Sequence, residues 1–231
     1  MSESPPTVAE SPPADRTKAP SQLVAEHLGR IIGRLQAEFL AGSAPTAWAQ
    51  ATLAKLRTGD INDPGGSPTS WQLIFEDLPE SLAGRGDGAS KGERVIHQVL
   101  SLYAVHQQGR RPYAMHVAGR SVGRAARDLA WIDHAAQANA GVVSRFHRLS
   151  STTDESLRLG HLRSLITMLR SERVSLDHAM LGRDLYQLLH PGTRTRVQLR
   201  WARDFHYRPP KKTDDQQNDT ATNEPIKETQ P

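Results

Sequence analysis

The chain has 231 residues, a hydrophobic share of 37% and an aromatic share of 5%, so it can bury one sizeable core or two smaller ones. It contains no cysteine, which excludes disulfides, thiolate catalysis and cysteine-based zinc sites. No secretory signal opens the sequence, and its longest apolar run falls far short of the roughly 20 residues of a membrane span. We therefore expect a cytoplasmic protein without a membrane partner.

Proline and polar residues dominate both ends of the chain. Residues 1–20 contain five prolines, and residues 209–231 contain four more among mixed charges and Gln, Asn and Thr. Neither segment has enough apolar surface to offset the entropy that ordering it would cost. We predict two disordered tails around one domain at residues 21–208.

Helical periodicity begins directly after the first tail. Ser21 is the expected N-cap of a first helix that Gly42 stops, and a second, alanine-rich helix ends near Gly59. A third helix is expected along the apolar residues of 71–82, where Pro79 limits or kinks it. Three helices are therefore predicted before the first glycine-rich loop.

Capping boxes are the clearest helix signals further along the chain. Ser90 and Glu93 have the spacing of such a box and open a long helix that Gly109 stops, and Thr152 and Glu155 have the same spacing. Five more helices are expected, at about 121–134, 140–150, 154–172, 176–190 and 194–207. Since no stretch alternates as a strand would, we predict an all-α fold of about nine helices in a bundle-like arrangement of two packed halves.

The two predicted halves differ in charge. Residues 22–93 hold six basic and nine acidic residues, a balance of −3, whereas residues 94–208 hold 18 basic and eight acidic residues, a balance of +10. All 18 cations of the second half are arginine. A genome rich in G and C would explain the choice of arginine over lysine but not the imbalance. The imbalance indicates a polyanionic partner for residues 94–208.

On three helices of the second half, arginines lie opposite the apolar stripe or flank it. They are Arg120, Arg124 and Arg127 with Trp131 on the helix at 121–134, Arg163 and Arg170 on the helix at 154–172, and Arg196, Arg200 and Arg203 with Tyr207 on the last helix. Any surface helix has a charged stripe, but these carry few compensating acids, and like charges at i,i+4 destabilise a helix. Phosphates would supply the counter-charge. The two aromatic residues fit either base stacking or packing against a neighbouring helix.

The sequence gives little support to catalysis. It contains no H-E-x-x-H metal motif, no phosphate-binding loop and no nucleophile elbow. Glu93 and His97 lie one helical turn apart, a spacing more typical of a helix-stabilising contact than of a catalytic base. We therefore expect no enzyme, no metal and no cofactor.

Several motifs resemble one known family. Residues 113–129 (YAMHVAGRSVGRAARDL) are similar to the M-H-x-x-G-x-S-L-G-R-A-L-R-x-L motif of the CasB family, the small subunits of the type I-E CRISPR Cascade complex. The segments 102–109, 145–146, 161–166 and 196–205 resemble further elements of that family, in the family's order. Val122 departs from the motif, which usually has Leu there. The resemblance covers about residues 22–208 and is strongest in the second half.

This resemblance implies an all-helical, non-catalytic subunit of a ribonucleoprotein. Its implied partners are the other Cascade protein subunits, a second copy of itself, the CRISPR RNA, the target DNA and the displaced single strand, which its basic surface would hold. Arginines that match the family's motifs are the candidate nucleic-acid contacts: Arg120, Arg124, Arg127, Arg145, Arg163, Arg196, Arg200 and Arg203.

Two other functions stay open at this point. A helix-turn-helix transcriptional regulator would place a recognition helix after a turn of three or four residues, and residues 121–134 and 140–150 are the segments that could form it. A helical scaffold that binds only proteins would use its arginines on acidic partners. Binding to unrelated single strands of DNA distinguishes the three hypotheses. Equal, salt-sensitive binding favours the Cascade subunit, sequence preference favours the regulator, and no binding favours the scaffold.

Overall fold

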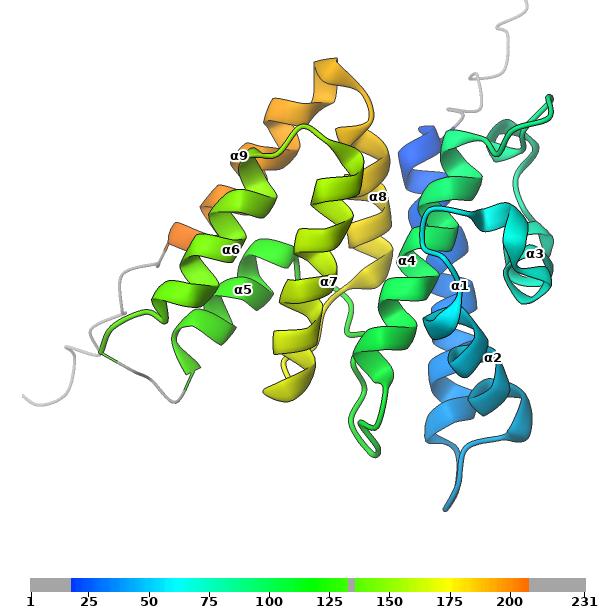
Figure 1. Ribbon diagram of the computed structural model, residues 1–231, viewed down its shortest axis with the longest axis horizontal. Helices are drawn as coiled ribbons and strands as arrows, with labels where there is room; N and C mark the ends of the chain where they lie inside the picture. Colours follow the sequence, from blue (N-terminus) through cyan, green and yellow to red (C-terminus); the bar gives the residue numbers. More distant parts are fainter. Residues whose placement is uncertain (1–17, 133–135, 208–231) are drawn as a thin grey trace, which may run out of the picture.

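The computed structural model describes residues 18–132 and 136–207, and this part of the chain is built almost entirely of helices (Figure 1). The α-helices are α1 (Pro20–Leu40), α2 (Ala47–Thr58), α3 (Pro68–Phe75), α4 (Lys91–Gln107), α5 (Val122–Ala130), α6 (Ala140–Ser151), α7 (Glu155–Ser171), α8 (His178–Leu188) and α9 (Pro191–His206). The predicted all-α fold is confirmed. Apart from residues 18–20, both predicted tails lie outside the described residues, and Pro20 begins α1.

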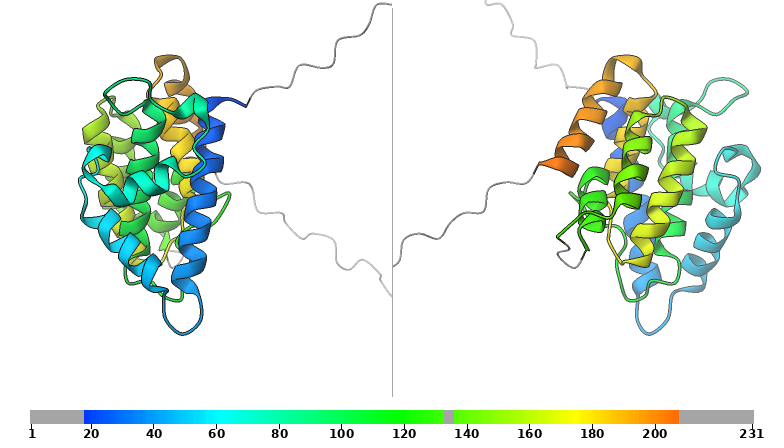
Figure 2. Two further views of the ribbon diagram at one scale, coloured as in Figure 1. Left: turned by 90° about the vertical axis from the view of Figure 1, so that its right-hand side faces the viewer. Right: turned by 60° about the vertical axis from the view of Figure 1, so that its left-hand side comes forward.

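The helices form two groups on either side of a central pair. In Figure 1, α1, α2 and α3 lie on one side and α5, α6, α7 and α9 on the other, with α4 and α8 between them. Both central helices contact elements of each group, α4 through α1 and α7, and α8 through α1 and α9. Figure 2 shows α9 at the outer edge of its group, beside α5. Buried apolar residues from both groups make one continuous core.

The predicted apolar stripes form this core. On α1, Val24, Leu28 and Leu35 are fully buried, and on α9 Val197 and Trp201 are fully buried as well. Within the described part of the chain, no helix is both long and apolar enough to cross a membrane. The buried residues of these stripes belong to one core shared by the helices.

Two predictions about the first helices are wrong. Ala19, not Ser21, is the N-cap of α1, because Pro20 begins the helix with a φ angle that suits the first turn. The third helix ends at Phe75, and residues 80–82 form a separate 3₁₀ turn. Trp71 and Phe75 on this helix face solvent, with 43% and 55% of their surface exposed, instead of joining the core.

One predicted capping box forms and the other does not. Ser90 Oγ accepts from the Glu93 backbone N–H at 3.0 Å, and Glu93 Oε2 accepts from the Ser90 backbone N–H at 2.8 Å. At α7, Asp154 is the cap, since its carboxylate accepts from the Leu157 N–H, so the box predicted at Thr152 is wrong.

The predicted pairing of Glu93 with His97 is also absent. The Glu93 carboxylate is occupied by the Ser90 cap and by the Gly84 N–H. His97 instead contacts the Ser70 hydroxyl through Nδ1 and the Asp60 carbonyl through Nε2. His97 therefore joins α4 to α3 and to the loop before it.

Candidate nucleic-acid interface

The segment 115–121, which carries the family-like motif, is fixed against residues 174–177. Gly119 has a φ of +81° and donates its N–H to Asp177 Oδ2 at 2.7 Å, while the Asp177 N–H donates to the Arg120 carbonyl at 2.8 Å. His116 and Leu176 form an isolated parallel β-bridge in the same contact. The glycine is needed here because other residues adopt this φ at a cost. These contacts therefore fix the position at which α5 begins.

A close approach of backbones joins α5 to α9. Ser121 caps α5 by accepting from the Arg124 N–H and donates its hydroxyl to Asp204 Oδ2 on α9 at 2.5 Å. Gly123 lies so close to the Trp201 carbonyl that a Cβ at this position would collide with it. The serine and the glycine of the motif thus set the spacing between the two helices.

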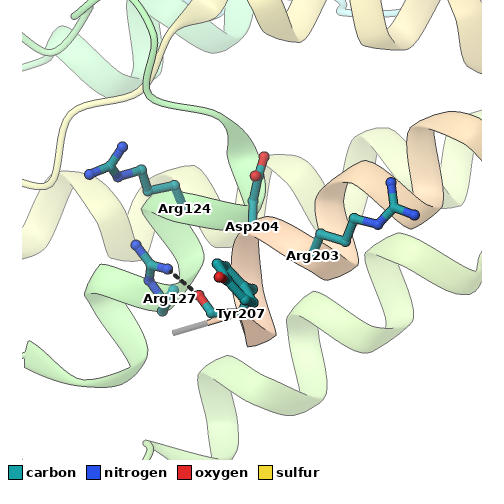
Figure 3. A pocket seen from close by; sticks show the side chains of 5 residues that line it. All are labelled: Arg124, Arg127, Arg203, Asp204 and Tyr207. Carbon is teal, nitrogen blue, oxygen red and sulfur yellow. Dashed lines mark hydrogen bonds between the residues drawn. The ribbon is translucent and has the colours of Figure 1, made fainter. Parts of the chain in front are cut away.

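A groove of about 550 Å³ lies along this junction (Figure 3). Arg124 and Arg127 line it from α5, and Arg203, Asp204 and Tyr207 line it from the end of α9. Figure 3 shows Arg124 and Arg127 on one side of Asp204 and Tyr207, and Arg203 on the other. The groove lining contains three arginines and one carboxylate, and that carboxylate already accepts a hydrogen bond from Ser121. The groove is therefore positively charged.

The side chain of Arg127 makes internal contacts as well as lining the groove. Its Nη1 donates to the Tyr207 carbonyl at 2.9 Å, so it satisfies the C-terminal end of α9. Its Nε also lies 3.8 Å from Asp128, and its side chain is only 22% exposed. Arg127 therefore contributes charge to the groove from a fixed position.

Arg120 does not belong to the stripe that the helical wheel placed it in. The helix begins at Val122 with Ser121 as its cap, so Arg120 lies in the preceding segment. Its guanidinium donates to Ser175 Oγ at 3.2 Å and lies 3.7 Å from Asp128. The predicted Arg120, Arg124 and Arg127 stripe is therefore reduced to its two helical members.

Arg200 is turned inward by a buried carboxylate. Its Nη2 donates to Asp184 Oδ1 at 2.5 Å, and the other oxygen of Asp184 accepts from Trp201 Nε1 at 2.7 Å. Asp184 is fully buried, and burial raises the pKa of its carboxyl, a rise that Arg200, Trp201 and Arg183 oppose. We assign Arg200 a structural role for this reason.

The other predicted arginines lie on the surface of three helices. Arg145 is exposed on α6 and donates to the Gly141 carbonyl of its own helix, while Arg163 on α7 and Arg196 on α9 are exposed. Six arginines of the second half have neither a guanidinium hydrogen bond nor an ion pair within the described residues: Arg124, Arg148, Arg163, Arg194, Arg196 and Arg203. They all belong to α5, α6, α7 or α9.

Two of these arginines were not among the sequence candidates. Arg148 lies one turn from Arg145 on α6, so i,i+3 spacing was an available signal. Arg194 precedes Arg196 in the first turns of α9, which begins at Pro191 and not at 194. The two aromatic residues of the stripes differ, because Trp131 packs partly against the core while Tyr207 is 63% exposed.

Comparison with known proteins gives a consistent result. The family model of the CRISPR-associated protein Cse2 matches residues 52–206. The chain belongs to the Cse2 family. This match runs from α2 to the last residue of α9 and includes most of the groove. No curated protein matches the chain.

Two solved structures of this family share the fold. The crystal structure of CasB from Thermobifida fusca is 28% identical in sequence, with a TM-score of 0.65 over 80% of this chain and 98% of the other. A CRISPR-associated Cse2-family protein from Thermus thermophilus is 25% identical, with a TM-score of 0.54 over 81% of this chain and 98% of the other. The all-helical fold described above is therefore similar to that of two solved members of this family.

Proposed function

We propose that this Cse2-family protein is the non-catalytic small subunit of a type I-E CRISPR Cascade complex in the cytoplasm. In that complex it binds the backbones of the guide RNA–target duplex and of the displaced DNA strand. The gathering of unpaired arginines on α5, α6, α7 and α9 carries this proposal. A second copy of the chain and the other Cascade subunits are its proposed protein partners.

Phosphate binding follows from the chemistry of the exposed side chains. Guanidinium groups match phosphate oxygens with two parallel hydrogen bonds, and arginines without an internal acid keep this capacity. No Asn or Gln flanks Arg124, Arg127 and Arg203 in the groove, so the described lining has no amide side chain to pair with an adenine edge. Its three arginines supply the charge that phosphate contacts need. R-loop formation exchanges duplexes of similar stability, so contacts of this sequence-independent kind are enough to favour it.

The geometry does not favour the helix-turn-helix alternative. Residues 131–139 separate α5 from α6, whereas that motif joins its helices by a turn of three or four residues. A scaffold that binds only proteins predicts no nucleic-acid binding at all, so the experiment below also tests it.

Fluorescence anisotropy with labelled single-stranded DNA of unrelated sequences tests the proposal. We expect similar affinities for all sequences and, if about six phosphates are engaged, a loss on the order of a thousandfold between about 50 and 200 mM salt. The double variant Arg124→Ala/Arg203→Ala should bind more weakly, with a salt slope reduced by up to about two.

A variant of equal charge change serves as the control. Arg57→Ala/Arg85→Ala removes two exposed or half-exposed arginines from the other half of the molecule, outside the groove. It should keep nearly the parent affinity. Equal losses in both variants would show that net charge, not this surface, determines binding, and a shallow salt slope would contradict phosphate contact.

A further inference from the structure

Two exposed histidine rings lie together on neighbouring helices outside the groove. The imidazoles of His147 on α6 and His206 at the end of α9 have ring centroids 5.7 Å apart and an angle of 34° between their planes. Both side chains are exposed, and neither has a side-chain hydrogen bond or ion pair within the described residues. Their ring faces and nitrogens are therefore available to a ligand.

Two buried phenyl rings support this pair from inside the protein. Phe146 and Phe205 are each 1% exposed and stack with centroids 4.2 Å apart and planes within 12°. His206 meets Phe205 edge-on at 4.8 Å, and His147 lies 6.3 Å from the same ring. Packed rings in a core are held in place, and they support the imidazoles above them. A ligand that contacts these imidazoles therefore loses little binding free energy to the ordering of protein side chains.

The pair adjoins the arginine groove. Arg203, which lines the groove, lies one turn before His206 on α9, and the exposed ring of Tyr207 directly follows. Isolated surface histidines are common on helices and indicate nothing by themselves. Here two of them meet across two helices, above a stacked phenyl pair and beside unpaired cations. Alternating cations and aromatic faces are what proteins present to unpaired nucleotides.

We propose that His147 and His206 form a stacking platform for unpaired bases of a single strand whose phosphates lie against Arg203 and Arg124. This inference rests on the proposed function and narrows it, because it assigns this face to a single strand and not to a duplex. In a duplex, the base faces are already covered by neighbouring base pairs, whereas in a single strand they can stack on an aromatic ring regardless of sequence. The platform thus adds a preference for strand type without a preference for sequence.

Binding of the full chain to three labelled ligands of equal length tests the platform. They are an oligothymidine of about 12 nucleotides, an abasic strand with the same number of phosphates, and a duplex. We expect oligothymidine to bind about tenfold more tightly than the abasic strand. His147→Ala/His206→Ala should abolish this preference and leave abasic and duplex affinities unchanged. His147→Phe/His206→Phe should restore it, since phenyl rings keep the stacking face.

A matched aromatic control comes from the other half of the molecule. Trp71→Ala/Phe75→Ala removes two exposed rings from α3 and should keep the full preference for bases. A preference that persists in His147→Ala/His206→Ala would overturn the platform, and so would an equal loss for all three ligands. If the parent protein bound none of them, the proposed function itself would fail. Weaker binding of all three ligands by Arg124→Ala/Arg203→Ala, together with a preference for bases in the parent protein, supports both proposals.

Discussion

Arg34 on α1 and Arg203 on α9 are both exposed arginines, yet their surroundings differ. Arg34 forms two hydrogen bonds with Glu76, at 2.8 and 2.6 Å, and lies 5.0 Å from the ring of Trp48. Arg30 and Asp77 form a similar ion pair beside it. Arg203 has no such partner within the described residues. The two arginines of α1 are therefore neutralised locally, and Arg203 on α9 is not.

The carboxylates of the second half explain this difference. Asp184 engages both Arg183 and Arg200, and Asp128 lies within ion-pair distance of Arg120 and Arg127. These two acids thus pair with arginines that belong to the fold, while Asp154, Asp177 and Asp204 accept hydrogen bonds from backbone N–H groups or from Ser121. The remaining arginines have no internal counter-charge and are available to an external anion. The net charge of the half does not show which arginines these are.

Removing Asp184 should have the largest effect of the changes considered. Asp184→Ala leaves the buried Trp201 N–H without its acceptor and two guanidinium groups without their counter-charge. We expect a loss of about 3 kcal/mol in the free energy of unfolding, roughly 6–12 °C in Tm. Arg200→Ala should cost less, because Asp184 keeps Arg183 and Trp201. A fall in Tm below about 2 °C in thermal denaturation would show that this cluster is not structural.

Acid should weaken the contact between the central helices. His106 on α4 lies 3.3 Å from His178 on α8, and burial lowers the pKa of His106 to about 4 from an ordinary 6.5. The unfolded chain therefore takes up the proton first, so stability is complete above about pH 6.5 and falls as the pH is lowered to about 4.

The full loss from His106 amounts to about 3 kcal/mol, of which about 2 kcal/mol is already lost at pH 5. Urea denaturation at several pH values measures it, and His106→Gln should flatten the curve. Equal stability at pH 7 and pH 5 would contradict the burial argument. The Arg34–Glu76 pair gives no comparable acid dependence in this range, because the hydrogen bonds from Arg34 lower the pKa of the Glu76 carboxyl below its ordinary value.

Gly123→Ala tests whether backbone contact sets the groove. The added methyl group would collide with the Trp201 carbonyl, and we expect a cost of about 1–3 kcal/mol together with weaker binding of single strands. Gly160 on α7 is the matched control, because nothing lies near its Cβ position. Gly160→Ala should stabilise the protein by up to about 1 kcal/mol. Destabilisation of equal size by both changes would show that the cost at Gly123 does not come from the contact with Trp201.

The smallest expected effects compare single surface arginines. Arg34→Ala removes a bidentate ion pair and a ring contact. It should lower the free energy of unfolding by about 1 kcal/mol, and by less at high salt. Arg203→Ala removes no internal partner and should change the free energy of unfolding by less than about 0.5 kcal/mol. Chemical denaturation of both variants tests the comparison directly. A larger cost for Arg203→Ala would reverse it.

Sequence periodicity was sufficient for the helices and for most of the core. The stripes of α1, α7 and α9 follow from apolar spacing alone, because a face that is apolar at 3.6-residue intervals has to be buried. The end of α3 was missed, since Leu78 and Leu82 continued the periodicity past the true end of the helix at Phe75. Local signals therefore identified the elements more reliably than their ends.

The sequence indicates which half of the chain carries excess arginines, but not which of these arginines lack an internal partner. Arg200 and Arg203 lie three residues apart on one face of the wheel, and only Asp184, supplied by a different helix, separates their roles. The His147 and His206 pair likewise depends on α6 meeting α9, which no spacing within either helix indicates. Contacts between helices that are distant in the sequence therefore determine which charged side chains remain available to a ligand.

The contact between α1 and α8 bears on how the protein is made. Gly182 lies against Leu28 so closely that any side chain at 182 would collide with it, and α8 covers the apolar stripe of α1. During synthesis, more than 150 residues must therefore leave the ribosome after Leu28 before its final neighbour exists. Long sequence separation of this kind slows folding, because a large loop has to close first. The first helix therefore reaches its final packing only after α8 has been made.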